Sequence, residues 1–478
     1  MNEIGIYWTV IVVYMFILIG VGLIASRKTR GIADFYLGGR NIGPFVTALS
    51  FIAAYFSSVV IIGGGGFGYK FGMSTLWVGA INVLLGCTLC WIFLGKRLRK
   101  YTQKLKTMTI PGFIAERFKA PEARIFSAVI IFILMLIYNV SVLKGMGHIF
   151  EVLMQIPYIY GILISGIIII LYVAIGGYLA VVWTSFVQAL IMIVGLLLLT
   201  SRTLFVVGGL TAANEKLAAI DPGLLSTPGI WGYAGLISFC LIVSFGVWGM
   251  PQLVIRFYSI KNTAVLRIGT VVVTIGGCLA LLPYLNGAVS RILFPALKNP
   301  DLAIPTLTKA VLSPLGAAIF LAAVVAAGMS TFAAVLIIVS SAIVRDFWQK
   351  GLKKKTDEKK LLRAERVVSV IAGVISLLIA IKPPGLILVL TAFAWSIIAS
   401  ATLWPILFGI YWRRTTRWGV TTSMFVGSIV ALIWMVIGEP FGIHGFIPGI
   451  SIGLIVIIIV SLLTKPPSKE FIRKIWED

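Results

Sequence analysis

Charged side chains are scarce in this chain. Only 12% of its 478 residues are Asp, Glu, Lys or Arg, whereas 59% are hydrophobic and the mean hydropathy is +1.05. A soluble protein of this length needs far more charge to cover its surface. The composition therefore excludes a soluble protein and predicts a polytopic membrane protein whose surface contacts lipid.

Acidic, histidine and cysteine side chains are too few and too dispersed for the site of an enzyme. The chain holds 16 acidic residues and 2 histidines, and the apolar runs contain almost none of them. Cys87 and Cys90 form a CxxC pair, but there is no second pair and no cluster of histidines, so a metal or redox site is disfavoured. The sequence disfavours an enzyme, and it lacks the filter motif that a channel requires.

What the chain has in abundance is long apolar runs. They predict about thirteen spanning helices, and no linker or soluble domain interrupts them. The first run is too long for a signal peptide and is expected to stay as a helix. The windows are 4–26, 42–68, 74–95, 125–147, 156–175, 180–207, 230–255, 267–287, 313–345, 367–381, 384–411, 418–437 and 446–464.

The formal net charge of +24 is explained by membrane topology and does not imply a nucleic-acid partner. Cytoplasmic loops of membrane proteins carry an excess of Lys and Arg. The odd-numbered connections and the C-terminal tail are therefore expected in the cytoplasm and the N-terminus outside, in a cell membrane. The basic residues that lie in odd-numbered connections include Arg27, Lys28, Arg30, Arg40, Lys96, Arg97, Arg99, Lys100, Lys104, Lys106, Arg124, Arg256, Lys261, Arg345, Lys350, Lys353, Lys354, Lys355, Arg413, Arg414 and Arg417.

Two apolar windows carry features that break helices. In the first, Tyr55, Ser57 and Ser58 lie at the centre of the span and the run Gly63 to Gly66 follows. In the second, Gly249 and Pro251 interrupt the run LISFCLIVSFGVWGMPQLVIRFYS. Paired interrupted helices at matching places in two halves predict an inverted-repeat transporter with its site at the membrane midplane. Close helix packing remains the alternative explanation of the four glycines.

Ser330 and Thr331 are adjacent in the ninth window, just after Gly328. Hydroxyls on a membrane helix often bond back to a carbonyl one turn earlier. Together with free carbonyls of an unwound helix, they also provide an uncharged oxygen cage that binds sodium weakly enough to release it.

Five ordered motifs resemble the sodium:solute symporter family: ADFYLGGRNIGPFVTALS, GGYLAVVWTSFVQALIMIVGLLLL, PQLVIRFYSIKN, AAGMSTFAAVLIIVSSAIVRDFW and GIYWRRTTRWG. The resemblance implies an all-α LeuT-type fold of inverted five-helix repeats and sodium-driven uptake by alternating access. On this sequence it implies a single membrane transporter domain over 1–478. Its parts are an extra first helix 4–26, core repeats at about 42–207 and 230–411, and extra helices within 418–464.

The resemblance also implies site residues. The family's sodium site, carried over to this chain, consists of backbone oxygens of Ala53, Phe56 and Ala327 with the hydroxyls of Ser330 and Thr331. The solute site, carried over in the same way, comprises Tyr55, Ser57, Ser58, Trp248, Gln252, Trp395 and Ser396. No protein partner is indicated by these motifs; the expected partners are sodium, a small solute and the lipid bilayer.

Departures from the family pattern bear on stoichiometry and solute. Ser185 stands where many members carry an Asp associated with a second sodium, which favours one sodium per cycle. Tyr55 stands where proline transporters carry an Asp, which argues against proline. The segments NPDLAIPTL, IKPPGLI and GIHGFIPGI look closest to the pantothenate and monocarboxylate branches. The expected solute is therefore an organic carboxylate; the alternative is proline or another amino acid, with proton coupling or a channel less favoured and a sugar improbable.

Positions relative to the membrane can also be predicted for three isolated features of the sequence. Lys144 is expected to extend from its helix to the outer membrane boundary. His148 and His444 are expected at the same boundary, where a role in proton coupling is a minor alternative. The segment 288–312 is expected to be an outer loop or, alternatively, to fold back against the membrane.

Overall fold

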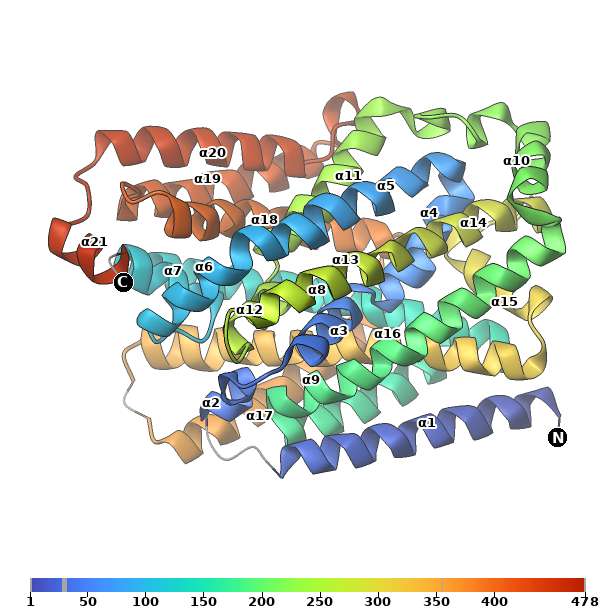
Figure 1. Cartoon of the computed structure of the whole chain (residues 1–478), viewed down its shortest axis with the longest axis horizontal. Helices are drawn as coiled ribbons and strands as arrows, with labels where there is room; N and C mark the ends of the chain where they lie inside the picture. Colours follow the sequence, from blue (N-terminus) through green and yellow to red (C-terminus); the bar gives the residue numbers. More distant parts are fainter. Residues whose placement is uncertain (1, 28–31, 355, 477–478) are drawn as a thin grey trace.

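The computed structural model describes residues 2–27, 32–354 and 356–476 as a bundle of helices that run along its long axis, with the termini at opposite ends (Figure 1). Within these ranges there is no β-strand, only an isolated bridge between Ile42 and Ile260. Lys28, Arg30 and Lys355, which belong to the predicted cytoplasmic basic residues, lie outside the described ranges.

The helices follow one another along the whole described chain. Their bounds are α1 Glu3–Ser26, α2 Ile32–Leu37, α3 Pro44–Tyr55, α4 Gly64–Phe71, α5 Leu76–Ile81, α6 Cys90–Lys104, α7 Ile110–Phe118, α8 Pro121–Met154, α9 Tyr158–Val207, α10 Gly209–Ile220, α11 Gly232–Gly249, α12 Pro251–Ser259, α13 Val265–Gly277, α14 Leu281–Leu293, α15 Ala303–Val311, α16 Pro314–Ser341, α17 Glu358–Ala380, α18 Ile387–Tyr411, α19 Arg417–Val436, α20 Phe446–Leu463 and α21 Lys469–Trp476. Shorter helical segments used below are η2 Val59–Gly63, η4 Asn82–Leu89, η8 Pro300–Leu302 and η9 Ala342–Gly351.

All thirteen predicted windows fall on helix. Ten helical segments in the described ranges are long and apolar enough to cross a membrane, and two shorter apolar helices cover Pro44–Tyr55 and Tyr158–Ala174. The windows 156–175 and 180–207 are joined in the single element α9, which changes direction at Gly177 (φ 61°, ψ −164°). That backbone conformation favours glycine, so the bend has a local cause.

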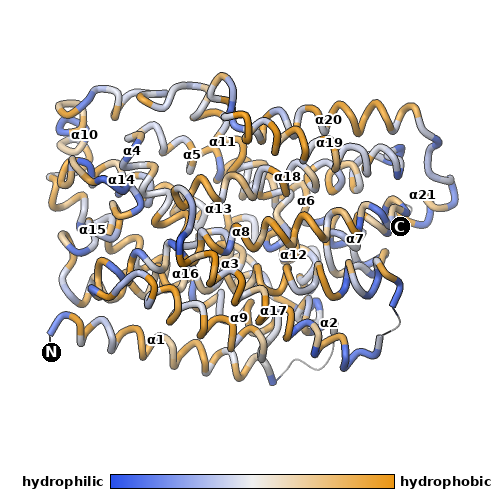
Figure 2. The backbone as a smooth tube through the Cα atoms, turned by 180° about the vertical axis from the view of Figure 1, so that it is seen from behind, coloured by the Kyte–Doolittle hydropathy of each residue, from blue (hydrophilic) through white to orange (hydrophobic). Residues whose placement is uncertain are grey.

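Helix α16 forms the centre of the bundle. It packs against α1, α8, α9 and α17, and the apolar window within it is buried throughout. Small residues permit the close approach: Gly328 faces Met146 of α8, and Gly195 of α9 faces Ala323. In both views α1 lies along one edge of the bundle and α19 and α20 along the opposite edge (Figures 1 and 2).

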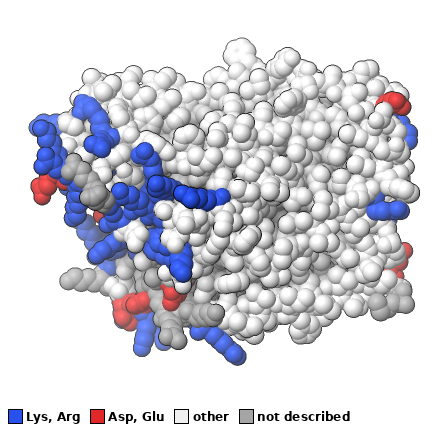
Figure 3. Space-filling view, viewed as in Figure 1, with Lys and Arg blue, Asp and Glu red and all other residues white. Residues whose placement is uncertain are grey.

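Lys and Arg gather at one end of the molecule. Figure 3 shows them at the left of the view, over the end that carries α2, α12 and the connection between α6 and α7. The tube in Figure 2 is mostly hydrophobic along the long helices, and its hydrophilic segments lie mainly toward the two ends. The loops that the charge rule assigns to the cytoplasm are thus on the same side of the bundle, and we call this side the basic end.

The run Gly63 to Gly66 serves close packing. A Cβ on Gly65 would collide with Ile304 of α15, one on Gly66 would lie 3.0 Å from the Pro300 carbonyl oxygen, and one on Gly64 would lie 3.4 Å from the Tyr284 ring. Of the two explanations left open by the sequence, packing accounts for these glycines. The same contacts place η8 and α15, within the predicted outer stretch 288–312, against the helical core.

Candidate sodium and solute site

The first predicted helix break is present. Helix α3 ends at Tyr55, and Phe56 has non-helical dihedrals (φ −80°, ψ 69°). The Ser57 N–H donates to the Tyr55 carbonyl at 2.9 Å, so it does not take up the Ala53 carbonyl as a continuing helix would. The helix resumes at Val59, whose N–H donates to the Ser57 hydroxyl at 3.2 Å. The break therefore turns backbone oxygens away from their usual partners.

The hydroxyls of α16 meet those oxygens. Ser330 Oγ donates to the Ala53 carbonyl at 2.8 Å and to the Ala327 carbonyl at 2.9 Å. Thr331 Oγ1 lies 3.2 Å from both the Ala54 and Ala327 carbonyl oxygens. All these residues are buried. Each hydroxyl therefore contacts a carbonyl of its own helix and a carbonyl of the broken helix, and its role in a sodium cage stays a prediction.

These uncharged oxygens are of the kind that the predicted sodium cage requires. In that prediction, each hydroxyl proton would rotate away from an entering cation, so that the hydroxyl lone pairs and the carbonyls face the ion. Sequence reasoning missed the Ala54 carbonyl, because carbonyl direction at a break depends on dihedral angles that composition does not encode. The membership of Phe56 in the cage remains a prediction, since no hydrogen bond within the described ranges joins its carbonyl to Ser330 or Thr331.

The second predicted break lies between α11 and α12. Met250 is extended (φ −78°, ψ 118°), and Pro251 begins α12 at a position where its missing N–H costs nothing. Thr402 of α18 donates its hydroxyl to the Gly249 carbonyl at 2.8 Å, and the Asn82 side chain of η4 donates to the Val243 carbonyl at 2.6 Å. Thr402 thus satisfies the Gly249 carbonyl, which the break releases, whereas Asn82 contacts a carbonyl more than one turn before the break.

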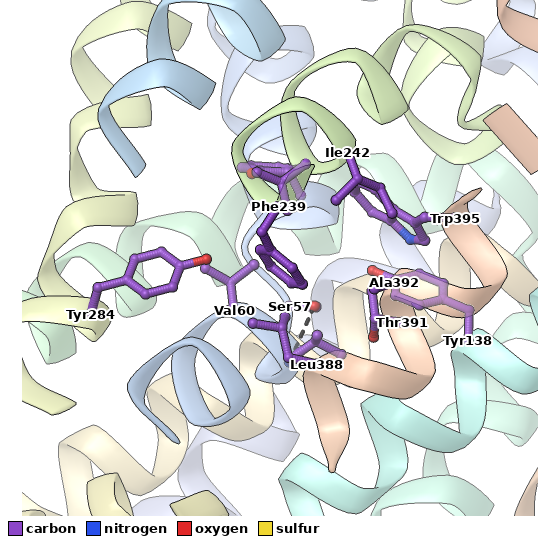
Figure 4. Close-up of a pocket in the computed structure, with 13 residues that line it drawn as sticks. Ser57, Val60, Tyr138, Phe239, Ile242, Tyr284, Leu388, Thr391, Ala392 and Trp395 are labelled. Carbon is purple, nitrogen blue, oxygen red and sulfur yellow. Dashed lines mark hydrogen bonds between the residues drawn. The ribbon is translucent and has the colours of Figure 1, made fainter. Parts of the chain in front are cut away.

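A narrow pocket lies between the two broken helices (Figure 4). Its volume is about 20 Å³, enough for a water molecule, so a solute enters only when the lining side chains move apart. The wall is largely aromatic and apolar, with hydroxyls from Ser, Thr and Tyr. The lining residues are Tyr55, Ser57, Val59, Val60, Tyr138, Phe239, Ile242, Val243, Tyr284, Leu388, Thr391, Ala392 and Trp395.

The structure brings three of the seven expected solute residues into this pocket, namely Tyr55, Ser57 and Trp395. Tyr55 and Trp395 face each other with ring centroids 6.3 Å apart. Sequence reasoning missed Tyr138 and Thr391. Thr391 lies one turn before Trp395 on α18, and its hydroxyl contacts Ser141 of α8 at 2.8 Å, so helical spacing from Trp395 was the signal that could have found it.

The other four expected residues face elsewhere. Ser58 donates to the Val142 carbonyl at 2.7 Å, and Trp248 Nε1 donates to the Leu85 carbonyl at 2.9 Å. Ser396 Oγ contacts the Ala392 carbonyl at 2.7 Å and His444 Nδ1 at 3.2 Å. Gln252 is fully buried, and its side-chain amide has no hydrogen-bond partner within the described ranges. A direct role for these four remains a prediction.

A buried ion pair lies beside the start of α18, the helix that carries Leu388 and Trp395 of the pocket wall. Lys144 Nζ of α8 lies 3.1 Å from Asp301 Oδ2 and donates to the Gly385 carbonyl at 2.6 Å. Asp301 also accepts from the Ile387 N–H at the start of α18, at 3.2 Å. The expectation that Lys144 extends to the membrane boundary is therefore wrong: a buried carboxylate from η8, distant in sequence, holds it inside the protein.

Taken together, two broken helices, a cluster of hydroxyl and carbonyl oxygens beside one break and a pocket between both are the features expected of a secondary transporter with the LeuT-type fold. Solved structures agree with this fold. A sodium-coupled sialic acid symporter in a substrate-bound, outward-open state superposes with a TM-score of 0.83 at 18% identity, over 97% of this chain and 98% of that one. The nucleobase-cation-symport-1 family transporter Mhp1, in a closed conformation, gives a TM-score of 0.59 at 16% identity, over 92% and 97%.

The chain belongs to the sodium:solute symporter family, whose model matches residues 35–427. It is similar to the osmoregulated proline transporter OpuE of Bacillus subtilis, at 33% identity over 96% of this chain and 95% of that protein. The high-affinity proline transporter PutP of the same organism is 30% identical over 94% and 96%. The sodium/proline symporter of Staphylococcus aureus is 31% identical over 96% and 93%. The protein is thus a multi-pass membrane symporter that couples a small solute to sodium, and it is not an enzyme.

Proposed function

We propose that this symporter takes up proline, or a small neutral amino acid of similar shape, together with sodium across the cell membrane. The observation that carries the proposal is the agreement of the similar proteins: the three relatives compared above, each aligned over more than nine-tenths of this chain, are proline transporters. This favours the amino-acid alternative over the organic carboxylate that the sequence motifs suggested.

The chemistry of the pocket supports a zwitterion. Its described lining holds no Lys, Arg, Asp or Glu side chain, so a solute with a net charge would lose its hydration without a protein counter-charge. An amino acid carries both charges itself. The aromatic and aliphatic wall, with Phe239 and Leu388 opposite Trp395, suits a compact apolar ring, and the Ser57 and Thr391 hydroxyls offer polar contacts.

Tyr55 is the residue on which the choice between solutes depends, because the family resemblance implies an Asp at this position in proline transporters. A carboxylate there would add an anionic partner for the ammonium group; the Tyr55 ring instead contributes to the wall. We therefore expect proline to bind through its ring and through neutral hydroxyls. The relevant stoichiometry is one sodium per solute, since Ser185 is uncharged; its buried hydroxyl has no hydrogen-bond partner among the described residues.

The test is a competition panel on the full chain reconstituted in vesicles. Uptake of labelled proline, driven by an inward sodium gradient, is measured with unlabelled proline, other neutral amino acids, monocarboxylates, pantothenate and sugars as competitors. We expect sodium-dependent uptake that neutral amino acids of proline's size inhibit and that a potassium gradient does not support. Uptake of a monocarboxylate or pantothenate that proline fails to inhibit would overturn the proposal.

A matched pair of variants links the result to the pocket. Thr391→Val removes a lining hydroxyl while keeping the side-chain volume, whereas Thr422→Val removes the hydroxyl of an exposed threonine on α19 that bonds only within its own helix. We expect only Thr391→Val to raise the proline concentration for half-maximal uptake. If both variants raise this concentration equally, the solute does not bind in this pocket.

A further inference from the structure

A second, polar pocket lies at the basic end, away from the solute pocket. It has a volume of about 230 Å³ and lies between the α6–α7 connection, the start of α8 and η9. Four basic side chains line it, Lys106, Arg124, Arg345 and Lys350, together with the acidic side chains Glu116 and Asp346. The lining therefore carries an excess of two positive charges at neutral pH.

One of the acidic groups is already neutralised. Glu116 pairs with Arg124 at 2.7 Å. The remaining lining charges are the Asp346 carboxylate, whose Oδ2 has no hydrogen-bond partner within the described ranges, and the cations of Lys106, Arg345 and Lys350, so the excess positive charge belongs to these three. Because most of the lining is polar or charged, the pocket suits a hydrated or anionic group and does not suit an apolar one.

Two buried hydrogen-bond donors in the lining have no partner. Thr107 Oγ1 and Arg124 Nε make no hydrogen bond within the described ranges, although the two residues are only 4% and 9% exposed. Buried polar groups are normally satisfied by protein, water or a ligand. Unpaired donors beside surplus positive charge indicate an oxyanion.

The connection that carries these donors is held in a fixed shape. Lys106 has a left-handed backbone conformation (φ 53°), which is uncommon for a residue with a side chain. Arg40 fixes the next residue by donating to the Thr107 carbonyl at 2.6 Å, and the Thr107 N–H donates to the Thr102 carbonyl at 3.0 Å. The donors are thus positioned before any ligand arrives, which reduces the entropy lost on binding.

We propose that this pocket binds a phosphate group, supplied by the headgroup of an anionic lipid or by free phosphate. The basic end is the side predicted to face the cytoplasm, where anionic headgroups accumulate. A phosphate oxygen accepts from Arg124 Nε and the Thr107 hydroxyl, and Lys106 and Lys350 balance its charge. The surplus of two positive charges is enough to balance free phosphate, which carries about −1.5 to −2 at pH 7, and the single negative charge of a phosphodiester headgroup.

The position of the pocket gives its occupant influence over transport. Thr109 and Asp346 also line a smaller cavity of about 10 Å³ that reaches Pro251, at the second helix break. A bound phosphate group therefore lies beside a cavity that reaches the second helix break. The binding site itself does not depend on which solute is carried.

The test measures binding without transport. The full chain, purified in a neutral detergent, is mixed with phosphatidylglycerol or phosphatidylcholine and examined by native mass spectrometry. We expect retention of phosphatidylglycerol over phosphatidylcholine, weakened about 25-fold in the Lys106→Gln/Lys350→Gln variant because each lysine contributes roughly a fivefold factor. The control Lys100→Gln/Lys359→Gln removes two exposed lysines outside the pocket and keeps the retention.

Inorganic phosphate identifies the source of the group. Displacement of phosphatidylglycerol by millimolar phosphate, absent with chloride at equal ionic strength, supports a site for the free anion; retention despite phosphate supports a lipid site. Equal retention of the two lipids with no effect of phosphate overturns the proposal, as does equal loss in the pocket and control variants. Sodium-dependent thermal stabilisation, measured on every variant, confirms that each one is folded.

Discussion

The sodium cage makes the sharpest prediction, because the chain offers a matched control on the same helix. Ser330→Ala removes a hydroxyl that joins the Ala53 and Ala327 carbonyls. Ser340→Ala removes an equally buried hydroxyl of α16 that bonds to the Ile337 carbonyl of its own helix and to the Glu365 side chain of α17. Both changes delete one oxygen from one helix, but only the Ser330 oxygen faces the break in α3.

A hydrogen bond or ligand contact to a charged group contributes about 1.5–3 kcal/mol, which corresponds to roughly 10- to 100-fold in a dissociation constant. We therefore expect Ser330→Ala to raise the sodium concentration for half-maximal uptake by about that factor, while Ser340→Ala changes it little. Thr331→Ser, which keeps the hydroxyl, is expected to lie close to the parent protein.

Two assays measure the effect independently. Sodium is titrated at fixed solute in reconstituted vesicles, and thermal unfolding is recorded in detergent with sodium or potassium. A ligand stabilises the folded state in proportion to the logarithm of its concentration over its dissociation constant, so the sodium-induced rise in unfolding temperature shrinks in Ser330→Ala. Identical sodium titrations for Ser330→Ala and Ser340→Ala would refute the assignment of the cage.

Two further predictions concern stability. Lys144→Met leaves the buried Asp301 carboxylate without its cation and is expected to lower the free energy of unfolding by about 3–5 kcal/mol. The double variant Lys144→Met/Asp301→Asn is expected to recover much of that loss. Thermal unfolding of both single variants and the double variant measures this, and an unaltered unfolding temperature in Lys144→Met would contradict the buried pair. Burial lowers the pKa of His444, outside the spanning helices, to about 4 from an ordinary 6.5. As the pH falls, the unfolded chain therefore binds a proton at His444 before the folded chain does, and this lowers the free energy of unfolding by ~3 kcal/mol between about pH 6.5 and about pH 4. The unfolding temperature of His444→Asn is expected to fall less steeply over that range. Equal slopes of unfolding temperature against pH in the variant and the parent protein would refute this prediction.

The helix breaks could be predicted from the sequence because their causes are local. Pro251 has no N–H to continue a helix, and polar residues with glycines at membrane depth signal a span that is interrupted. Ser330 and Thr331 could be named because two adjacent hydroxyls in an otherwise apolar helix are conspicuous. The position at which such a helix is interrupted follows from the residues that form the helix.

The direction of individual side chains at the site could not be predicted in the same way. Successive residues on a helix point about 100° apart, so Trp395 and Ser396 cannot both face one pocket; Trp395 faces it and Ser396 faces His444. Ser57 and Ser58 divide similarly at the first break. The pairing of Lys144 with Asp301 depends on where η8 packs, and no periodicity within either segment contains that information.

If the proposed sodium and solute sites are correct, the geometry of the first break couples them. The Ala53 and Ala54 carbonyls face the α16 hydroxyls, while Tyr55 and Ser57, within four residues of Ala53, face the solute pocket. An ion that orders this short segment orders both sites, and linkage requires the effect to be reciprocal: whatever factor sodium adds to solute affinity, the solute adds to sodium affinity. Ser330→Ala must therefore reduce the gain in solute affinity that sodium produces, although Ser330 is not among the residues that line the pocket. A variant that weakens sodium binding and leaves that gain unchanged would place the coupling outside the break.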